Sequence, residues 1–134
     1  MSKIDTTQWK DYAIADLFEI KKGTRLTRAN MKDGDIRYIG ASTFNNGITA
    51  QISNDEHLHP ANSISVSYNG SVGEAFYQDE PFWASDDVNV LYPKFQLTRN
   101  IALFIIPIIK QIGKQYAFID KWKKEDMERD MLKL

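Results

Sequence analysis

The spacing of apolar residues changes along the chain, and this change limits the folds that the chain can adopt. Up to position 93, apolar residues occur in short runs that alternate with polar ones, as in 63–68. From Ile101 to Ile112 they recur every three or four residues, which is the period of one face of an α-helix. The sequence therefore predicts an α+β fold, a twisted, mostly antiparallel sheet with one main helix of the last third of the chain packed on it.

Two Asn-Gly pairs mark tight turns within the strand-rich part. Both residue types tolerate a positive φ, which the turn of a hairpin requires. Asn46-Gly47 lies between two expected strands, and Asn69-Gly70 lies between two more. The expected strands are 36–39, 48–52, 63–68, 72–77, 82–84 and 88–92.

The expected main helix has clear boundary signals. Thr98 is a suitable N-cap and Gly113 a suitable C-terminal stop. Pro107 lies inside the periodic segment, and we expect it to kink the helix or split it in two. Shorter helical turns are expected before a first strand that ends near Ile20 and again within 122–129.

Length and composition indicate one ordinary globular domain. The chain has 134 residues and no cysteine, which excludes disulfides and thiolate metal sites. Its first residues are polar, and the apolar run 101–109 is much shorter than the roughly 20 residues that span a bilayer. We therefore expect residues 1–134 to form a single cytoplasmic domain.

The charged residues are unevenly distributed although the net charge is only −1. Residues 38–93 contain seven acids and no Lys or Arg, whereas both flanking segments carry a net positive charge. Solvated surface charge accounts for this pattern locally. The alternative is that the two ends of the chain together present one positive face.

No candidate catalytic or metal site has the pattern that its chemistry needs. His57 and His59 lack a third ligand, and Asp86 with Ser85 lacks a nucleophile-elbow motif. Gly70 to Gly73 is followed by no lysine, so a phosphate-binding P-loop is not indicated. The sequence predicts no catalytic residue and no metal ligand.

Polar side chains at the turns suit the recognition of nucleic acid. Hydroxyl and carboxamide groups contact base edges, and lysine and arginine hold phosphates. Ordinary turn composition explains the same residues locally. The candidate base-contact residues are Ser42, Thr43, Asn45, Asn46, Tyr68 and Asn69. The candidate phosphate or guanine contacts are Lys21, Lys22, Arg25 and Arg28.

Several segments resemble one known family in both content and order. They are Trp9 with 16–26, 34–42 running into 45–48, 64–73 with 75–77, 84–91, and the closing 127–134. In these segments the chain resembles the target-recognition domain of type I restriction–modification specificity subunits. It is similar in the same way to the DNA-recognition subunits of type II systems that combine cleavage and methylation. The resemblance covers essentially the whole chain.

The resemblance implies a non-catalytic module that recognises one half of a bipartite site in double-stranded DNA. In that family, long helices beyond the domain join two such modules and dock methyltransferase subunits. The resemblance implies that S-adenosylmethionine binds to the methyltransferase subunits and that this domain itself has no cofactor. A nuclease subunit completes the assembly. This sequence ends at Leu134, before such a helix, so the expectation is an excised domain or a truncated product.

Three alternatives remain at this point. A glycan-binding β-rich module would use Trp83, Tyr68 and Tyr77 as stacking platforms. A small hydrolase would use His57 or His59 with Asp86. A fused methyltransferase–nuclease would carry the same target-recognition domain within one chain.

Overall fold

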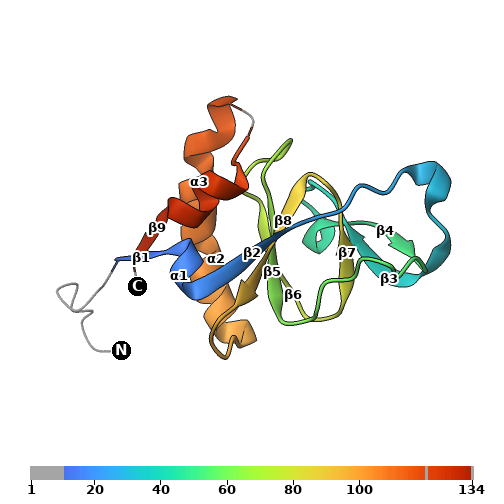
Figure 1. Ribbon diagram of the computed structural model, residues 1–134, viewed down its shortest axis with the longest axis horizontal. Coiled ribbons are helices and arrows are strands. Elements are labelled where there is room, and N and C mark those ends of the chain that lie inside the picture. The colour runs from blue at the N-terminus through green and yellow to red at the C-terminus, as the bar shows by residue number, and fades with distance from the viewer. Residues whose placement is uncertain (1–10, 120, 134) are drawn as a thin grey trace.

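The computed structural model describes residues 11–119 and 121–133 (Figure 1). Its largest sheet has four antiparallel strands, and it lies in the middle of the molecule. The order across this sheet is β2 (Phe18–Lys22), β8 (Val88–Pro93), β5 (Ser63–Ser67) and β6 (Ala75–Gln78).

Two smaller sheets lie on either side of the central one. At one end, β1 (Asp11–Ala13) pairs with β9 (Met131–Lys133), which brings the first and last described segments together. At the other end, β3 (Asp33–Ile39) lies between β4 (Ile48–Ile52) and β7 (Phe82–Ala84). The β3–β7 pair is parallel, and every other strand pair of the described residues is antiparallel.

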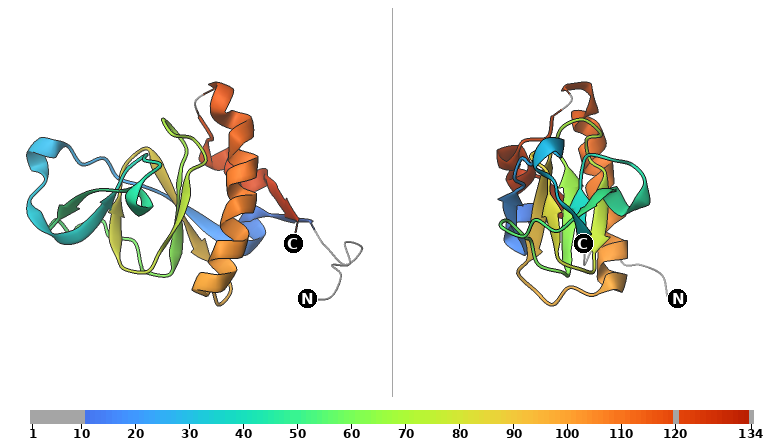
Figure 2. Two further views of the ribbon diagram at one scale, coloured as in Figure 1. Left: turned by 180° about the vertical axis from the view of Figure 1, so that it is seen from behind. Right: turned by 90° about the vertical axis from the view of Figure 1, so that its right-hand side faces the viewer.

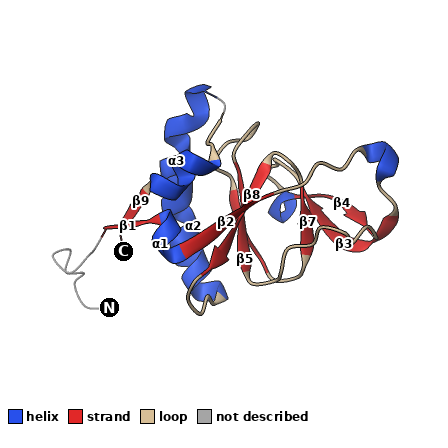
Figure 3. Cartoon of the chain, in the orientation of Figure 1, coloured by secondary structure: helices blue, strands red, loops and turns tan. Residues whose placement is uncertain are grey.

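The α-helices gather at the end of the molecule that carries β1 and β9 (Figures 2 and 3). They are α1 (Ile14–Leu17), α2 (Arg99–Gly113) and α3 (Lys124–Arg129). Within the described residues, 3₁₀ turns connect other elements at Arg28–Asn30, Asn45–Gly47 and Lys114–Ile119.

The two faces of the central sheet bury different cores. In β8, Leu91 lies opposite Ile20 and Ile64, and all three pack beneath the helices with residues such as Ile109. Because side chains alternate along a strand, Val88 and Val90 point to the other face. There they pack with side chains of the three-stranded sheet, so β8 contributes to both cores.

The structure confirms the predicted fold class and most of the predicted elements. Thr98 caps α2, since its Oγ1 accepts a hydrogen bond from the Ile101 N–H at 3.2 Å, and the helix ends at Gly113. Of the kink or split expected at Pro107, the split does not occur, because α2 runs through this residue without a break. Pro107 is exposed, while neighbours such as Ile105, Ile106 and Ile109 are buried, and this packing offsets the lost backbone bond.

None of the helices in the described part of the chain is long and apolar enough to cross a membrane.

Candidate nucleic-acid interface

The turn between β7 and β8 holds the segment that follows β2. The carbonyl oxygen of Val88 accepts a hydrogen bond from the Gly23 N–H at 2.9 Å. The carbonyl oxygen of Ala84 accepts one from the Thr24 N–H at 2.8 Å. The Trp83 indole N–H then donates to the Thr24 carbonyl at 2.8 Å. These bonds fix the start of the basic segment 21–28 against the β7–β8 turn.

The same turn also holds the Asn69-Gly70 turn. The Asp87 carbonyl accepts the Tyr68 N–H at 3.0 Å, and the Tyr68 hydroxyl donates to the Asp86 carbonyl. The Asn69 amide donates to the Asp87 carboxylate at 3.1 Å. Burial, followed by the nearby Asp87 and Asp86 charges, raises the pKa of Tyr68, so its hydroxyl stays protonated as a donor.

A third polar segment reaches this place from β3. The Ser85 N–H donates to the Ile39 carbonyl at 2.9 Å, so the end of β3 lies at the same turn. Beyond it, the Cβ of Ala41 lies 3.4 Å from the position that a Cβ on Gly70 would occupy. Segments distant in sequence therefore meet at one edge of the molecule. We call it the polar edge and define it as residues 23–25, 40–45, 68–71 and 85–87.

Gly23 is required where the basic segment crosses the β7–β8 turn. A Cβ at this position would lie 1.8 Å from the Ser85 carbonyl oxygen, and 2.7 Å from those of Ala84 and Val88. These are backbone atoms and cannot rotate away. Any larger residue would therefore push the segment off the turn.

The loop that carries four of the candidate base-contact residues is anchored through Asn46. Its amide donates to the Tyr77 carbonyl at 3.2 Å and to the Gln78 side chain at 3.3 Å. Gln78, which is fully buried, donates back to the Asn46 carbonyl at 3.0 Å. Asn45 and Asn46 both have a positive φ, of 53° and 57°. The Asn46 side chain thus holds the loop to β6, while Asn45 is exposed.

This difference predicts unequal effects of two matched substitutions. Glycine accepts the positive φ at either position, so each change removes only a side chain. We expect Asn46→Gly to lower the free energy of unfolding by about 1–3 kcal/mol, because it removes the two hydrogen bonds that the Asn46 amide donates to the Tyr77 carbonyl and the Gln78 side chain. We expect Asn45→Gly to cost at least about 1 kcal/mol less. Urea unfolding of the two variants measures the difference, and equal costs would contradict the anchoring role.

Most of the other predicted contact residues lie at or beside the polar edge. Lys22 and the exposed Arg25 lie at the start of the basic segment, beside Gly23, and Ser42 and Thr43 follow Ala41 in the third segment. Lys21 points to the opposite face of β2 from Lys22, and its ammonium pairs with the Glu19 carboxylate, which raises the pKa of Lys21.

Arg28 lies apart from the polar edge. It begins the 3₁₀ turn at the far end of the molecule from the helices (Figure 3). The structure therefore gathers Arg25, Ser42, Thr43, Asn45, Tyr68 and Asn69 at the polar edge, with Lys22 adjoining it, and does not gather Lys21 or Arg28 with them. Which of these residues contact DNA stays a prediction.

Several residues suited to binding were missed by the sequence analysis. Lys121 and Lys123 come next to the polar edge because the Trp122 N–H donates to the Tyr68 carbonyl at 2.6 Å. The net positive charge of residues 94–134 was the sequence signal that could have indicated these two lysines. Asp86 is exposed at the edge, and carboxylates accept hydrogen bonds from cytosine. Phe44 is 79% exposed in the third segment and suits contact with a thymine methyl group.

A hydrolase site at His59 and a sugar-stacking site at Trp83 both lack their required geometry. His59 is buried, stacks on Phe82 and bonds through Nδ1 to the Tyr92 hydroxyl at 2.7 Å. Tyr92 lies four residues, about 13 Å, along β8 from Val88, so His59 is remote from Asp86. Trp83 is 3% exposed, which leaves it no free face for stacking on a sugar. Among the described residues, no group of three or more His, Cys, Asp or Glu side chains could hold a metal ion.

The buried His59 predicts a pH dependence of stability. Burial, and then the neighbouring His57, lower the pKa of His59 from 6.5 to about 4. Between these values the unfolded chain binds a proton that the folded chain does not, so stability falls as the pH falls. From pH 7 to pH 5 we expect His59 to account for a loss of about 2 kcal/mol. Urea titrations at both pH values measure this loss. It should be absent in His59→Gln and should remain in the control His57→Gln, because His57 is exposed.

Comparison with known proteins identifies the family of this chain. Residues 6–128 match the family model described as the type I restriction modification DNA specificity domain. The chain belongs to this family. The match confirms the resemblance found in the sequence, and it identifies a specificity module rather than a catalytic one.

Individual relatives support the same assignment. The chain is 36% identical over 127 residues to the type II restriction enzyme specificity subunit S.BcgI of Heyndrickxia coagulans. That alignment covers 94% of this chain and 37% of the relative. The chain therefore spans little more than a third of the length of the curated relative that it matches.

Solved structures share the fold of this specificity domain. The S subunit of a type I system from M. genitalium superimposes with a TM-score of 0.77 at 17% identity, over 96% of this chain and 34% of that one. The HsdS subunit of Thermoanaerobacter tengcongensis gives a TM-score of 0.70 at 14% identity, over 94% of this chain and 33% of that one.

Proposed function

We propose that this specificity domain binds double-stranded DNA through the polar edge and recognises one half of a bipartite target. The observation that carries the proposal is the convergence of three polar segments on the β7–β8 turn. They bring hydroxyl, amide and carboxylate groups to one edge, where Ser42, Asn69 and Asp86 are suited to base edges. Lysine and arginine at its flanks are suited to the phosphates on either side.

The proposed partners follow from this role. Within a complete specificity subunit, the domain would direct a methyltransferase subunit to its site, and S-adenosylmethionine would bind to that partner. A nuclease subunit would join the same assembly. The relatives named above are specificity subunits of both type I and type II enzymes, so either kind of assembly suits this domain.

Salt dependence distinguishes DNA binding from glycan binding. Each phosphate contact releases counterions and adds about −0.9 to the slope of log affinity against log salt concentration. We expect the chain to bind a mixed-sequence duplex weakly, with a slope of roughly −3, because few basic residues flank the edge. Fluorescence anisotropy at several salt concentrations measures this slope. Absence of duplex binding at low salt, or salt-independent binding of an oligosaccharide, would overturn the proposal.

A further inference from the structure

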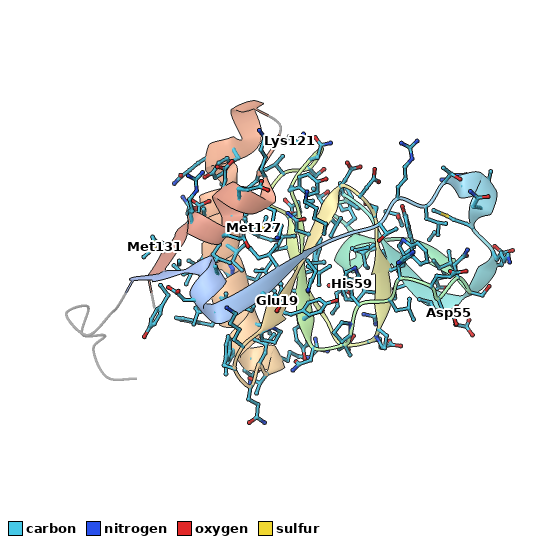
Figure 4. All side chains as sticks on the ribbon, viewed as in Figure 1. Glu19, Asp55, His59, Lys121, Met127 and Met131 are labelled. Carbon is cyan, nitrogen blue, oxygen red and sulfur yellow. The ribbon has the colours of Figure 1, made fainter. Side chains whose placement is uncertain are left out.

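A small basic pocket lies between the central sheet and the segment before α3. It has a volume of about 170 Å³. Figure 4 shows Lys121, which lines this pocket, near the upper border of the molecule. We call it the lysine pocket, and its walls include Lys22, Tyr68, Asn89, Lys121, Lys123 and Lys124.

Both ends of the sequence build the lysine pocket. Lys22 lies directly opposite Asn89 in the register of β2 and β8, so the two side chains share one face of the sheet. Lys121 forms an isolated β-bridge with Asn69, and the Trp122 N–H binds the Tyr68 carbonyl. The pocket is therefore joined through the backbone to a turn of the polar edge.

Asn89 is the unusual residue of this pocket. Leu91, two residues further along β8, shares its face and lies in the apolar core. Asn89 is only 1% exposed, and neither its amide nitrogen nor its amide oxygen has a hydrogen-bond partner among the described residues. Leaving a buried amide unpaired costs about 1–3 kcal/mol. A ligand that accepts hydrogen bonds within the pocket would supply a partner for the amide nitrogen.

The charges of the pocket specify the kind of ligand. Four lysines line it, against one carboxylate, that of Glu125. The Lys124 ammonium has a further acidic neighbour, Glu128, at 3.7 Å. The volume equals that of about five or six water molecules at liquid density, which suits a small group rather than a base with its sugar. The expected ligand is a small anion that accepts several hydrogen bonds.

We propose that the lysine pocket binds one backbone phosphate of the DNA beside the polar edge. This inference rests on the proposed function and adds a phosphate site of which the sequence indicated only Lys22. Asn89 would donate its amide hydrogens to a phosphate oxygen, and Lys22, Lys121 and Lys123 would neutralise the charge. Because a phosphate carries no sequence information, the pocket would set the position of the domain on DNA and not its specificity.

Binding of a mixed-sequence duplex tests this site without knowledge of the target. We expect the double change Lys121→Gln and Lys123→Gln to reduce the magnitude of the salt slope by about one unit, the contribution of a single phosphate contact. Lys32→Gln, an exposed lysine outside the pocket, is the matched control and should leave the slope unchanged. Asn89→Leu should weaken duplex binding at least fivefold without lowering the melting temperature, since it removes an unpaired polar group.

Inorganic phosphate distinguishes the possible sources of the anion. In NMR titrations of the unaltered chain, phosphate should shift the Asn89 side-chain amide and compete with the duplex. If phosphate shifts this amide while all pocket variants bind duplex normally, the pocket takes a free anion and the DNA assignment is wrong. If neither ligand responds to the pocket variants, the site itself is disproved. If no form binds duplex but phosphate still binds the pocket, the proposed function fails and the anion site stands.

Discussion

Replacing Trp122 by alanine is expected to lower the free energy of unfolding by about 3–5 kcal/mol, the usual cost of truncating a buried Trp. The side chain is fully buried and stacks on Tyr116 with ring centroids 5.4 Å apart. Its indole N–H donates to the Asp130 carboxylate at 2.7 Å. The Tyr116 hydroxyl donates to the same carboxylate, and burial, followed by this bond, raises the pKa of Tyr116 to about 12.

Urea unfolding of Trp122→Ala measures this loss. Phe104→Ala is the matched control, because Phe104 is also a large apolar residue of the helical end but is 62% exposed. We expect the control to change stability by less than about 0.5 kcal/mol. A loss below about 1 kcal/mol for Trp122→Ala would show that the 121–130 segment is not held as the structure places it.

Replacing Gly23 by alanine is expected to disrupt the polar edge itself. The added Cβ would overlap the Ser85 carbonyl oxygen, at 1.8 Å, so the basic segment must move away from the β7–β8 turn. Overpacking of this kind costs about 1–3 kcal/mol, or more where backbone must shift. Because Lys22 and Arg25 move with the segment, affinity for duplex DNA should also fall at least tenfold, or about 1.4 kcal/mol.

Gly40→Ala provides the control for the Gly23 substitution. Its Cβ would lie 3.0 Å from the Oγ1 and 3.1 Å from the Cγ2 of Thr49, an exposed side chain that can shift by a small amount. We expect this variant to retain most of its stability; because Gly40 itself belongs to the polar edge, it is a control for stability and not for DNA affinity. Duplex binding by anisotropy and urea unfolding would be measured on both variants. Unchanged values for Gly23→Ala would contradict the tight crossing on which the polar edge depends.

Local patterns were sufficient to predict most elements of the fold. The three- and four-residue spacing predicted α2, and its boundary residues Thr98 and Gly113 gave the correct ends. The division of strands among three sheets was not predicted, since strand pairing joins residues far apart in sequence. The parallel pairing of β3 with β7 is an example, because Tyr38 lies opposite Trp83. The continuous helix at Pro107 depends likewise on packing from other elements.

The candidate site was predicted less completely, for related reasons. Residue type alone indicated Lys22 and Asn69 as contact residues, but it could not separate Asn45 from Asn46. That distinction depends on Gln78, which reaches Asn46 from another strand. Alternation along β2 could have separated Lys21 from Lys22 if the strand had been extended to residue 22. The lysine pocket depends on Asn89 meeting residues from the far end of the chain, which no local pattern indicates.

Transfer of target specificity is the most direct test of the central claim. The domain would replace the matching domain of a complete specificity subunit, and the methylated motif would be mapped across a genome. We expect the half of the bipartite motif assigned to that position to change to a new sequence, while the other half stays as before. Methylation of the original motif by the assembled hybrid enzyme would contradict the claim that this domain recognises DNA sequence.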